Sequence, residues 1–376
     1  MELSNTKYGI IFDKIWSVKK RLVRCVINNF IKMNKTNLIF IVILLLIGIT
    51  SFSQTQKEYK AGCIAFYNIE NLFDTIPGEN DVEFTPSSEK QWNSQKYYQK
   101  METMASVIAE IGADFTGTAP AIVGLSEIEN ITVLEDLVKA DPIKDYNYQI
   151  VHFDGSDYRG VDCALLYRPE FFTVTHTAMH VVRTPDDPDF RTRDQLVVSG
   201  IYDGEEMHFI ILHWPSRRGG EKRSAPKRAA AAEVTRSIVD SILIINPKAK
   251  IICMGDLNDD PIDQSVKTHL NATGTKEEAI LPKLYNPMEE LYKKGIGSLA
   301  YQDKWNLFDQ IIMTPEFLDQ DKSSYRFYKA LIFNKPYLMQ KEGKFKGYPF
   351  RTYVGNTYMG GYSDHFPSYI FIIKEK

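Results

Sequence analysis

Residues 250–259 read KIICMGDLND, a short apolar stretch that ends in carboxylate and amide side chains. The apolar run from Ile251 to Met254 gives a strand two apolar faces, because successive side chains of a strand point to opposite sides of the sheet. A sheet that contains such a strand must be covered on both sides. This stretch therefore predicts a central strand of a layered α/β protein, with polar groups at its carboxyl end.

Eight further stretches have the character of strands, being short and rich in apolar and β-branched residues. They span residues 62–69, 121–127, 148–153, 161–167, 195–202, 207–213, 307–313 and 368–373. Apolar side chains at helical spacing predict helices over 90–111, 130–139 and 226–245. Two sheets packed together, each with helices on its outer face, account for this mixture of elements.

Residues 38–49, LIFIVILLLIGI, form an apolar run that is shorter than the roughly 20 residues needed to span a bilayer. A basic start, such a run and the small residues Ser51 and Ser53 are typical of a secretory signal peptide. We expect a signal peptide over 33–53, cleavage after Ser53, and export to the periplasm, the cell surface or the medium. Residues 1–32 are then a mis-called upstream extension. The alternative is an uncleaved anchor, which alone would bring membrane contact.

No Gly-, Pro- or Ser-rich linker divides the remaining chain, so residues 54–376 are predicted to form a single domain. Residues 1–53 carry eight Lys or Arg and two Asp or Glu, so 37 of the 45 basic and 46 of the 48 acidic residues remain, a formal charge of −9. That charge argues against broad electrostatic capture of nucleic acid. Any polyanion must therefore be held locally.

The cysteines indicate neither a disulfide framework nor a metal centre. Cys63, Cys163 and Cys253 each lie in an apolar, strand-like stretch, and their spacing is not that of metal ligands. We expect all three to be small core residues.

Polar side chains recur where the predicted strands end. They are Asn68, Glu70, Glu127, His213, Asp256 and Asn258 at strand ends, Asp309 within 307–313, and Asp364 and His365 just before the last strand. Strand ends of an α/β fold can gather in one crevice. Hard cations take oxygen ligands, and hydrolysis of a phosphodiester needs a base, charge stabilisation and help for the leaving oxygen. Carboxylates, amides and two histidines could supply all three.

Six motifs resemble, in the same order, those of the endonuclease/exonuclease/phosphatase superfamily of metal-dependent phosphoesterases. They are YNIEN (67–71), GLSEIEN (124–130), ILHWPSR (211–217), GDLND (255–259), WNLFDQI (305–311) and SDHFP (363–367). The resemblance covers nearly all of 54–376 and implies one catalytic domain of this type. Its fold would be a four-layer α/β sandwich, with two packed, mainly antiparallel sheets flanked by helices. The implied cofactor is Mg²⁺ or Mn²⁺.

The resemblance also implies metal ligands. Glu127 resembles the principal ligand, and Asn68 the neighbouring amide that holds water or phosphate at the metal. Asp364 would be a further carboxylate at or near the metal. Glu70 matches a position where some members have a second acidic ligand and others have none, so both readings stay open.

Catalytic roles follow in the same way for five residues. His365 resembles the histidine that contacts the scissile phosphate or activates water, and Asp309 the acid that orients it. Asp256 and Asn258 would position the attacking water and bind the phosphate. His213 would act on the leaving-group side. Which histidine is the acid and which the base stays open.

Two arginines and one loop are further candidates for substrate contact. Arg159 and Arg193 are expected near the mouth of the site, where a guanidinium group suits phosphate. Residues 335–358 interleave basic and aromatic side chains. This stretch could stack bases or grip a head group, or it could be a solvated hairpin packed by its own aromatic rings.

The predicted function is an exported, divalent-metal-dependent phosphodiester hydrolase, an endonuclease on nucleic acid. It acts as a monomer with no obligate protein partner. The alternative is the same chemistry on a lipid or sugar phosphate, as in sphingomyelinase-like or inositol-phosphate phosphoesterases. The acidic net charge favours this alternative, and the motif around His213 favours the nuclease. A non-catalytic binding module is disfavoured, because no motif has lost its chemical group.

Overall fold

The structure is a computed structural model of the 376-residue chain, and it describes residues 21, 58–78, 83–184, 187 and 189–376. The chain divides into Met1–Glu58 and Tyr59–Lys376, and every element discussed below lies in the second unit. The predicted extension (1–32, apart from Arg21) and the predicted signal peptide (33–53) lie outside the described residues. No helix within the described ranges is both long enough and apolar enough to span a bilayer.

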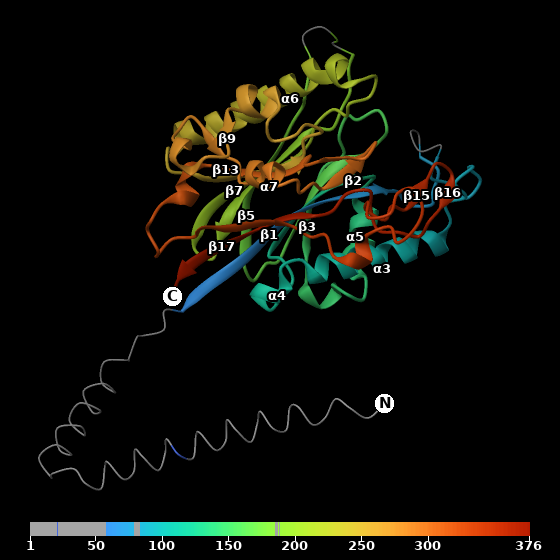
Figure 1. Cartoon of the computed structure of the whole chain (residues 1–376), viewed down its shortest axis with the longest axis horizontal. Helices are drawn as coiled ribbons and strands as arrows, with labels where there is room; N and C mark the ends of the chain where they lie inside the picture. Colours follow the sequence, from blue (N-terminus) through green and yellow to red (C-terminus); the bar gives the residue numbers. More distant parts are fainter. Residues whose placement is uncertain (1–20, 22–57, 79–82, 185–186, 188) are drawn as a thin grey trace, which may run out of the picture. The chain divides into compact units, whose positions relative to one another are not determined.

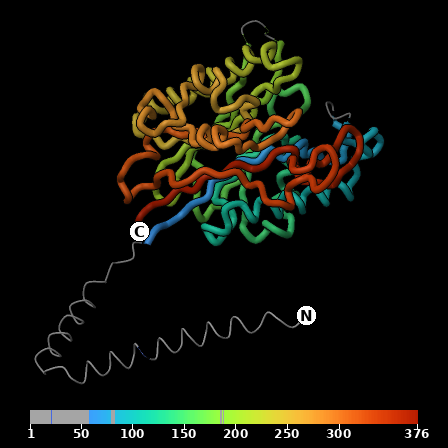
Figure 2. The backbone as a smooth tube through the Cα atoms, viewed as in Figure 1, coloured from blue at the N-terminus to red at the C-terminus, as the bar shows by residue number. Residues whose placement is uncertain are grey.

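A six-stranded sheet forms one inner layer. Its strand order is β14 (Arg326–Ile332), β17 (Ser368–Glu375), β1 (Tyr59–Leu72), β2 (Ile122–Ile128), β4 (Asp162–Tyr167) and β3 (Gln149–His152). Strands β1 and β2 pair in parallel, and the other neighbours pair antiparallel. The first and last of these strands in sequence, β1 and β17, lie side by side, as Figure 2 shows.

A seven-stranded sheet forms the other inner layer. Its order is β5 (Phe172–His180), β6 (Gln195–Tyr202), β7 (Glu205–His213), β8 (Lys250–Asp256), β13 (Asp309–Met313), β10 (Leu284–Tyr285) and β9 (Ala272–Thr273). Here β7 with β8 and β10 with β9 are parallel, and the rest are antiparallel. Two small hairpins pair β11 (Leu299–Tyr301) with β12 (Lys304–Asn306) and β15 (Tyr353–Val354) with β16 (Thr357–Tyr358).

The helices are α3 (Ser94–Glu110), α4 (Ala113–Thr116), α5 (Ile131–Lys139), α6 (Glu221–Ile245) and α7 (Met288–Lys293). Helix α7 contacts β13 of one sheet and β14 of the other. Helices α3 and α5 lie on the side of the six-stranded sheet, and α6 lies on the side of the seven-stranded sheet (Figure 1). Short 3₁₀ turns span Lys144–Tyr146, Lys276–Glu278, Pro315–Leu318 and Pro336–Leu338, and a π turn spans Ser265–His269.

Strand β8 shows why the layers form. Its residues Ile251 and Cys253 belong to the core under α6, and its residues Ile252 and Met254 belong to the larger core that includes β1 and α3. Alternate side chains of one strand thus fill two different cores, as the apolar stretch 250–256 predicts. The prediction of a four-layer α/β sandwich with two mainly antiparallel sheets is confirmed. Cys63, Cys163 and Cys253 are buried free thiols.

All nine predicted strands and three predicted helices exist, with differences at their ends. The two- and three-residue strands β9, β10, β11, β12, β15 and β16 were not predicted, and neither were the longer strands β5 and β14. Both are outermost strands of their sheets, and exposed polar side chains interrupt their apolar pattern. Helix α6 begins at Glu221 rather than at residue 226, so Pro226 lies inside it. We predicted the start at Pro226 because proline is common in the first turn of a helix, but Pro226 lies in the second turn of α6.

The sheet topology brings the predicted polar residues to one edge. The parallel strands β7 and β8 end together, with His213 opposite Asp256. Strand β13 runs antiparallel to β8 and begins at the same edge, with Asp309 opposite Asp256. The carboxyl ends of β1 and β2, also parallel, supply Asn68 and Glu127.

An ion-pair network ties the two sheets at the other end of β7. Glu205 accepts a hydrogen bond of 2.6 Å from Lys250 Nζ at the start of β8 and one of 3.1 Å from Lys374 Nζ of β17. Burial raises the pKa of Glu205, but hydrogen bonds from Lys250, Ser324 and the Tyr325 backbone outweigh it and hold the pKa below its ordinary value. The charged form of Glu205 therefore stabilises the fold.

We expect Glu205→Gln to lower the free energy of unfolding at pH 7 by about 2 kcal/mol, since hydrogen bonds to a charged group are lost. The folded pKa lies below the unfolded value of about 4.3, so this stabilisation is present above that pH and is lost as the pH falls through the folded pKa. Urea unfolding at pH 7 and near pH 3 checks this. An equal difference between variant and wild type at both pH values would contradict it.

Candidate active site

A buried Asp–His pair lies at the edge where the strands meet. His365 Nδ1 donates a hydrogen bond of 2.7 Å to Asp309 Oδ2, and the Asp309 side chain is fully buried. Ser363 Oγ fixes the turn, because it accepts from the His365 backbone N–H and donates to the Asn68 carbonyl. Burial lowers the pKa of His365, but Asp309, Asp256 and Asp364 outweigh burial and raise it well above its ordinary value. His365 is therefore a cation at neutral pH.

The second histidine lies on the other side of Asp256. His213 Nε2 is 3.6 Å from Asp256 Oδ2 and 4.0 Å from Glu127 Oε1. Burial, with the positive charges of Arg193, Arg159 and His365, lowers the pKa of His213 well below its ordinary value. The two imidazoles thus flank one carboxylate in opposite protonation states.

Asp256 is held between amide groups. Asn68 Nδ2 donates to Asp256 Oδ2 at 3.1 Å, and the Asn258 backbone N–H donates to Asp256 Oδ1 at 2.9 Å. The Asn258 side chain itself donates to the Trp214 carbonyl at 3.0 Å. Burial raises the pKa of Asp256 to about 6, with a lowering contribution from His365 and raising contributions from Asp309 and Glu127. Asp256 is thus a better proton acceptor than an ordinary carboxylate.

Glu127 reaches the site from an irregular position in β2. Its φ of 64° is in the left-handed region, where the pairing of β2 with β4 shifts register between Ser126 and Ile128. Such a conformation is strained for a residue other than glycine. Glu127 Oε2 accepts a hydrogen bond of 2.9 Å from the Asn71 N–H, and Oε1 lies 3.5 Å from Arg159 Nη2. The strand irregularity therefore points the carboxylate into the cleft.

The donor set fits a hard divalent cation. Glu127 Oε1 and Asp256 Oδ2 both lie within 4.0 Å of His213 Nε2, and the Asn68 side chain donates a hydrogen bond to Asp256. The mutual repulsion of Asp256, Asp309 and Glu127 contributes to the raised pKa of Asp256. A bound cation would relieve that repulsion, and carboxylate and amide oxygens are the ligands that Mg²⁺ and Mn²⁺ prefer. Glu127 and Asn68 are the residues that would hold it, and Asp256 lies beside them.

Glu70 and Asp364 lie in a neighbouring pocket of about 340 Å³ rather than in the wall of the cleft. Arg351 Nη2 donates to Asp364, and the Thr352 N–H donates to Glu70 Oε2 at 2.6 Å. Burial and the charge of Asp364 raise the pKa of Glu70 to about 7, against the lowering charge of the buried Lys100. Coordination of a metal by Asp364 would require Arg351 to move away.

The cleft has a volume of about 230 Å³. It is lined by Glu127, Tyr158, Arg159, Arg193, His213, Ser216, Arg218, Asp256, Asn258 and His365. Arg159 lies at its rim with 35% of its side chain exposed, as predicted. Arg193 also lines the cleft, but its side chain is buried and donates to Asp157 Oδ2 and to the Trp214 carbonyl.

Asp157 gave no signal in the sequence, and its fully buried side chain pairs with Arg159 and Arg193. Arg351, which pairs with Asp364, belongs to the basic and aromatic loop 335–358. In that loop Tyr353 packs on Tyr358 of the same loop and on Phe84 and Trp92 outside it. Ser363 could have been recognised from the sequence as a residue of the site, because it directly precedes Asp364 in the SDHFP motif.

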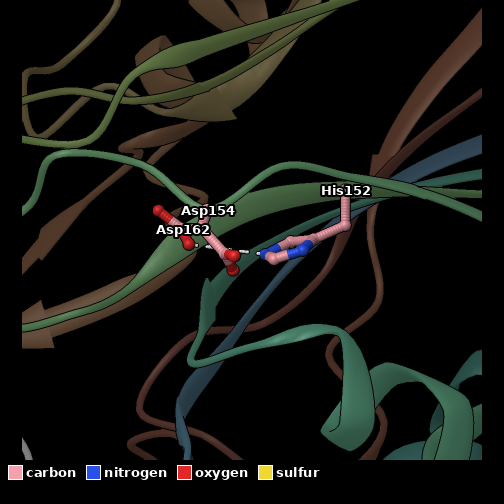
Figure 3. Close-up of side chains that lie close together, drawn as sticks. All are labelled: His152, Asp154 and Asp162. Atoms are coloured by element: carbon pink, nitrogen blue, oxygen red, sulfur yellow. Dashed lines mark ion pairs between the residues drawn. The ribbon is translucent and has the colours of Figure 1, made fainter.

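A second group of potential metal ligands lies outside the cleft. His152, Asp154 and Asp162 offer ligand atoms that all lie within 4.8 Å of one another, and His152 Nε2 is 3.4 Å from Asp162 Oδ2 (Figure 3). None of the three lines the cleft. His152 and Asp162 lie at the two ends of the loop that carries Arg159, so their ion pair closes the base of that loop.

Comparison with known proteins agrees with this architecture. A model of the Endonuclease/Exonuclease/phosphatase family matches residues 63–374. A D. rerio TDP2 humanized by 14 mutations is 15% identical, with a TM-score of 0.52 over 83% of this chain and 99% of that chain. An endonuclease/exonuclease/phosphatase family protein from Bacteroides thetaiotaomicron is 16% identical, with a TM-score of 0.50 over 85% of this chain and 97% of that one.

A third similar structure is D. rerio TDP2 complexed with single strand DNA product, which is 15% identical, with a TM-score of 0.50 over 83% of this chain and 98% of that one. At these identities the structural likeness shows the fold alone. A search of curated proteins gave no match. The match of the family model over 63–374, with the strand-end carboxylates and histidines gathered in one cleft, shows that the chain belongs to the endonuclease/exonuclease/phosphatase family of phosphoesterases.

Proposed function

We propose that this protein is a Mg²⁺- or Mn²⁺-dependent phosphodiesterase that cleaves nucleic acid internally. The observation that carries the proposal is the row His213, Asp256, His365 and Asp309 across one cleft, with Glu127 and Asn68 beside it. This row combines a cation, a proton acceptor and oxygen ligands within one small space. Those are the groups that phosphodiester hydrolysis requires.

Each residue of the row has a task that its surroundings support. His365, held as a cation by Asp309, presents Nε2–H to the cleft and can donate to a phosphate oxygen. Asp256, with its pKa raised to about 6, can take a proton from the attacking water. Arg159 at the rim can bind a second phosphate oxygen. The metal would supply positive charge opposite the phosphate oxygens.

Nucleic acid is the preferred substrate class because the motif around His213 resembles that of nucleases, and because TDP2, a protein of the same fold, has been found with a single strand DNA product. A second candidate is a lipid or sugar phosphate, as in a sphingomyelinase-like or inositol-phosphate enzyme. The formal charge of −9 for residues 54–376 favours that candidate. Both candidates use the same cleft.

A substrate panel separates these functions. The purified protein is incubated with plasmid DNA, RNA, sphingomyelin and inositol phosphates, in Mg²⁺, Mn²⁺ or EDTA. We expect turnover of DNA or RNA with either metal and none with EDTA. Turnover of sphingomyelin or inositol phosphates alone would replace the nuclease by the second candidate. No turnover of any phosphoester would overturn both and favour a non-catalytic binding module.

We propose also that the protein is exported, on the basis of the apolar run at 38–49 and the small residues that follow it. The amino terminus of the protein recovered outside the cytosol is then expected to begin at Gln54. An intact amino terminus in the membrane fraction would contradict cleavage and favour an anchor.

A further inference from the structure

A pocket of about 590 Å³ opens beside the active-site cleft, at the amino end of α6. We call it the basic pocket, and it is defined by Arg191, Arg218, Arg223 and Lys227 with the aromatic residues Tyr158 and Phe190. Asp187 is the one carboxylate among its described lining residues. This local excess of positive charge stands against the formal charge of −9 for residues 54–376.

The basic pocket is continuous with the active-site cleft. Tyr158, Arg193, Ser216 and Arg218 line both. His213, which ends β7, lies three residues before Ser216, so the segment 214–218 leads from the active site into the basic pocket. A substrate held in the cleft can therefore extend into the pocket without a change in the fold.

Several positive groups face this space. Arg218 Nη1 donates a hydrogen bond of 2.8 Å to the Tyr158 hydroxyl. Lys227 Nζ lies 3.7 Å from the centre of the Phe190 ring and 3.8 Å from Asp187 Oδ2, an ion pair that a phosphate would replace. Arg223 is exposed in the first turn of α6. Gly220, the residue before that turn, has no side chain to cap the first N–H groups of this 25-residue helix. The positive end of the helix dipole therefore adds to the cations.

The 340 Å³ pocket that shares Arg159 with the cleft has a different character. It is lined by the carboxylates Glu70, Glu83 and Asp364 and by the cations Lys90, Arg159 and Arg351, so its formal charges cancel. A chain of phosphates is therefore attracted more strongly by the basic pocket. Tyr158, half of whose surface is exposed (51%), also offers a ring on which a base can stack.

We propose, on the basis of the phosphodiesterase function above, that the basic pocket binds a second phosphate of a nucleic-acid strand whose scissile phosphate lies in the cleft. Arg223 and Lys227 contact that phosphate, and Tyr158 stacks on a base between the two phosphates. The substrate is then a strand rather than a single phosphodiester. An acidic protein binds a polyanion in this way through one local site.

The test compares two substrates with the full chain and three variants. One substrate is a labelled single strand of about ten nucleotides, within the usual range of strand-binding sites, and the other is bis(p-nitrophenyl) phosphate, which has one phosphate. The double variant Arg223→Ala with Lys227→Ala removes two pocket cations. Arg223→Lys keeps the charge. Lys222→Ala is the matched control, because Lys222 is exposed in the same helical turn but does not line the pocket.

We expect the double variant to lower kcat/KM for the strand by about tenfold or more, through KM, since charge-assisted hydrogen bonds to phosphate are lost. Its kcat/KM for bis(p-nitrophenyl) phosphate should stay within about twofold of wild type. The slope of log kcat/KM for the strand against log salt concentration should become shallower by about one per cation removed. Arg223→Lys should recover part of the loss, and Lys222→Ala should behave as wild type.

Three results would overturn the proposal: no change on the strand, an equal loss on both substrates, or the same loss in Lys222→Ala. Binding of the labelled strand in EDTA, followed by fluorescence anisotropy, separates this proposal from the enzymatic function. If the wild type binds the strand through the pocket cations but hydrolyses neither substrate, the basic pocket stands and the proposed phosphodiesterase function fails.

Discussion

Asp309→Asn is expected to lower kcat for phosphodiester hydrolysis by about 10²–10⁴-fold, the range for loss of a positioned acid–base partner. Asp309 Oδ2 accepts the hydrogen bond from His365 Nδ1 and keeps that imidazole charged. An Asn side chain carries no negative charge, so it would favour the neutral ring. A neutral ring that donates Nδ1–H to the Asn oxygen has no proton on Nε2, and a ring that accepts from the Asn NH₂ keeps Nε2–H but loses the positive charge that would face the phosphate.

The chain offers a matched control for this substitution. Asp162 is also buried and also pairs with a histidine, His152, but the pair lies outside the cleft. Asp162→Asn should therefore keep kcat within about threefold of wild type. Steady-state rates and circular dichroism of both variants check the prediction. Near-wild-type activity of a folded Asp309→Asn protein would show that the Asp309–His365 pair has no part in the reaction.

Glu127→Gln is expected to lower kcat/KM by about 10³-fold, because the substitution removes a charged oxygen ligand that helps to place positive charge opposite the phosphate. Affinity for Mn²⁺, measured by the electron paramagnetic resonance of free Mn²⁺, should fall by at least about tenfold. The amide is nearly isosteric, and the hydrogen bond from the Asn71 N–H can persist. A loss of activity and of Mn²⁺ affinity would therefore result from the missing negative charge and not from altered packing.

Glu129→Gln is the control, since Glu129 lies two residues further on and accepts a hydrogen bond from the Asp74 N–H. It should bind Mn²⁺ and turn over substrate as the wild type does. Unchanged Mn²⁺ affinity in Glu127→Gln would exclude this carboxylate as a ligand. A loss in Glu129→Gln instead would move the metal to the other carboxylate of the GLSEIEN motif.

The sequence predicts those site residues that lie at the ends of strands. Each of His213, Asp256 and Asp309 lies at the end of a strand with a strong apolar pattern, and parallel or antiparallel pairing then places them in register. The same applies to Asn68 and Glu127. The apolar pattern of each strand therefore predicts which polar side chains lie at its end. The pairing of the strands then brings these side chains together at one edge of the sheets.

Contacts that depend on long-range packing could not be read from the sequence. The buried pairing of Arg193 with Asp157, 36 positions away, consumes a guanidinium group that the sequence suggested for phosphate. Likewise, Arg351 reaches Asp364 only because the hairpin β15–β16 folds back beside β1. Strands β5 and β14 were missed because edge strands have too few apolar contacts to leave a clear pattern.

Cleavage of a labelled single strand by the wild-type protein, with and without divalent metal, tests the central claim most directly. We predict internal cleavage that yields fragments of several lengths in Mg²⁺ or Mn²⁺, no product in EDTA, and recovery of activity when metal is added back. Absence of product with both metals, or cleavage that continues in EDTA, would contradict a metal-dependent nuclease site built on Glu127, Asp256 and the two histidines.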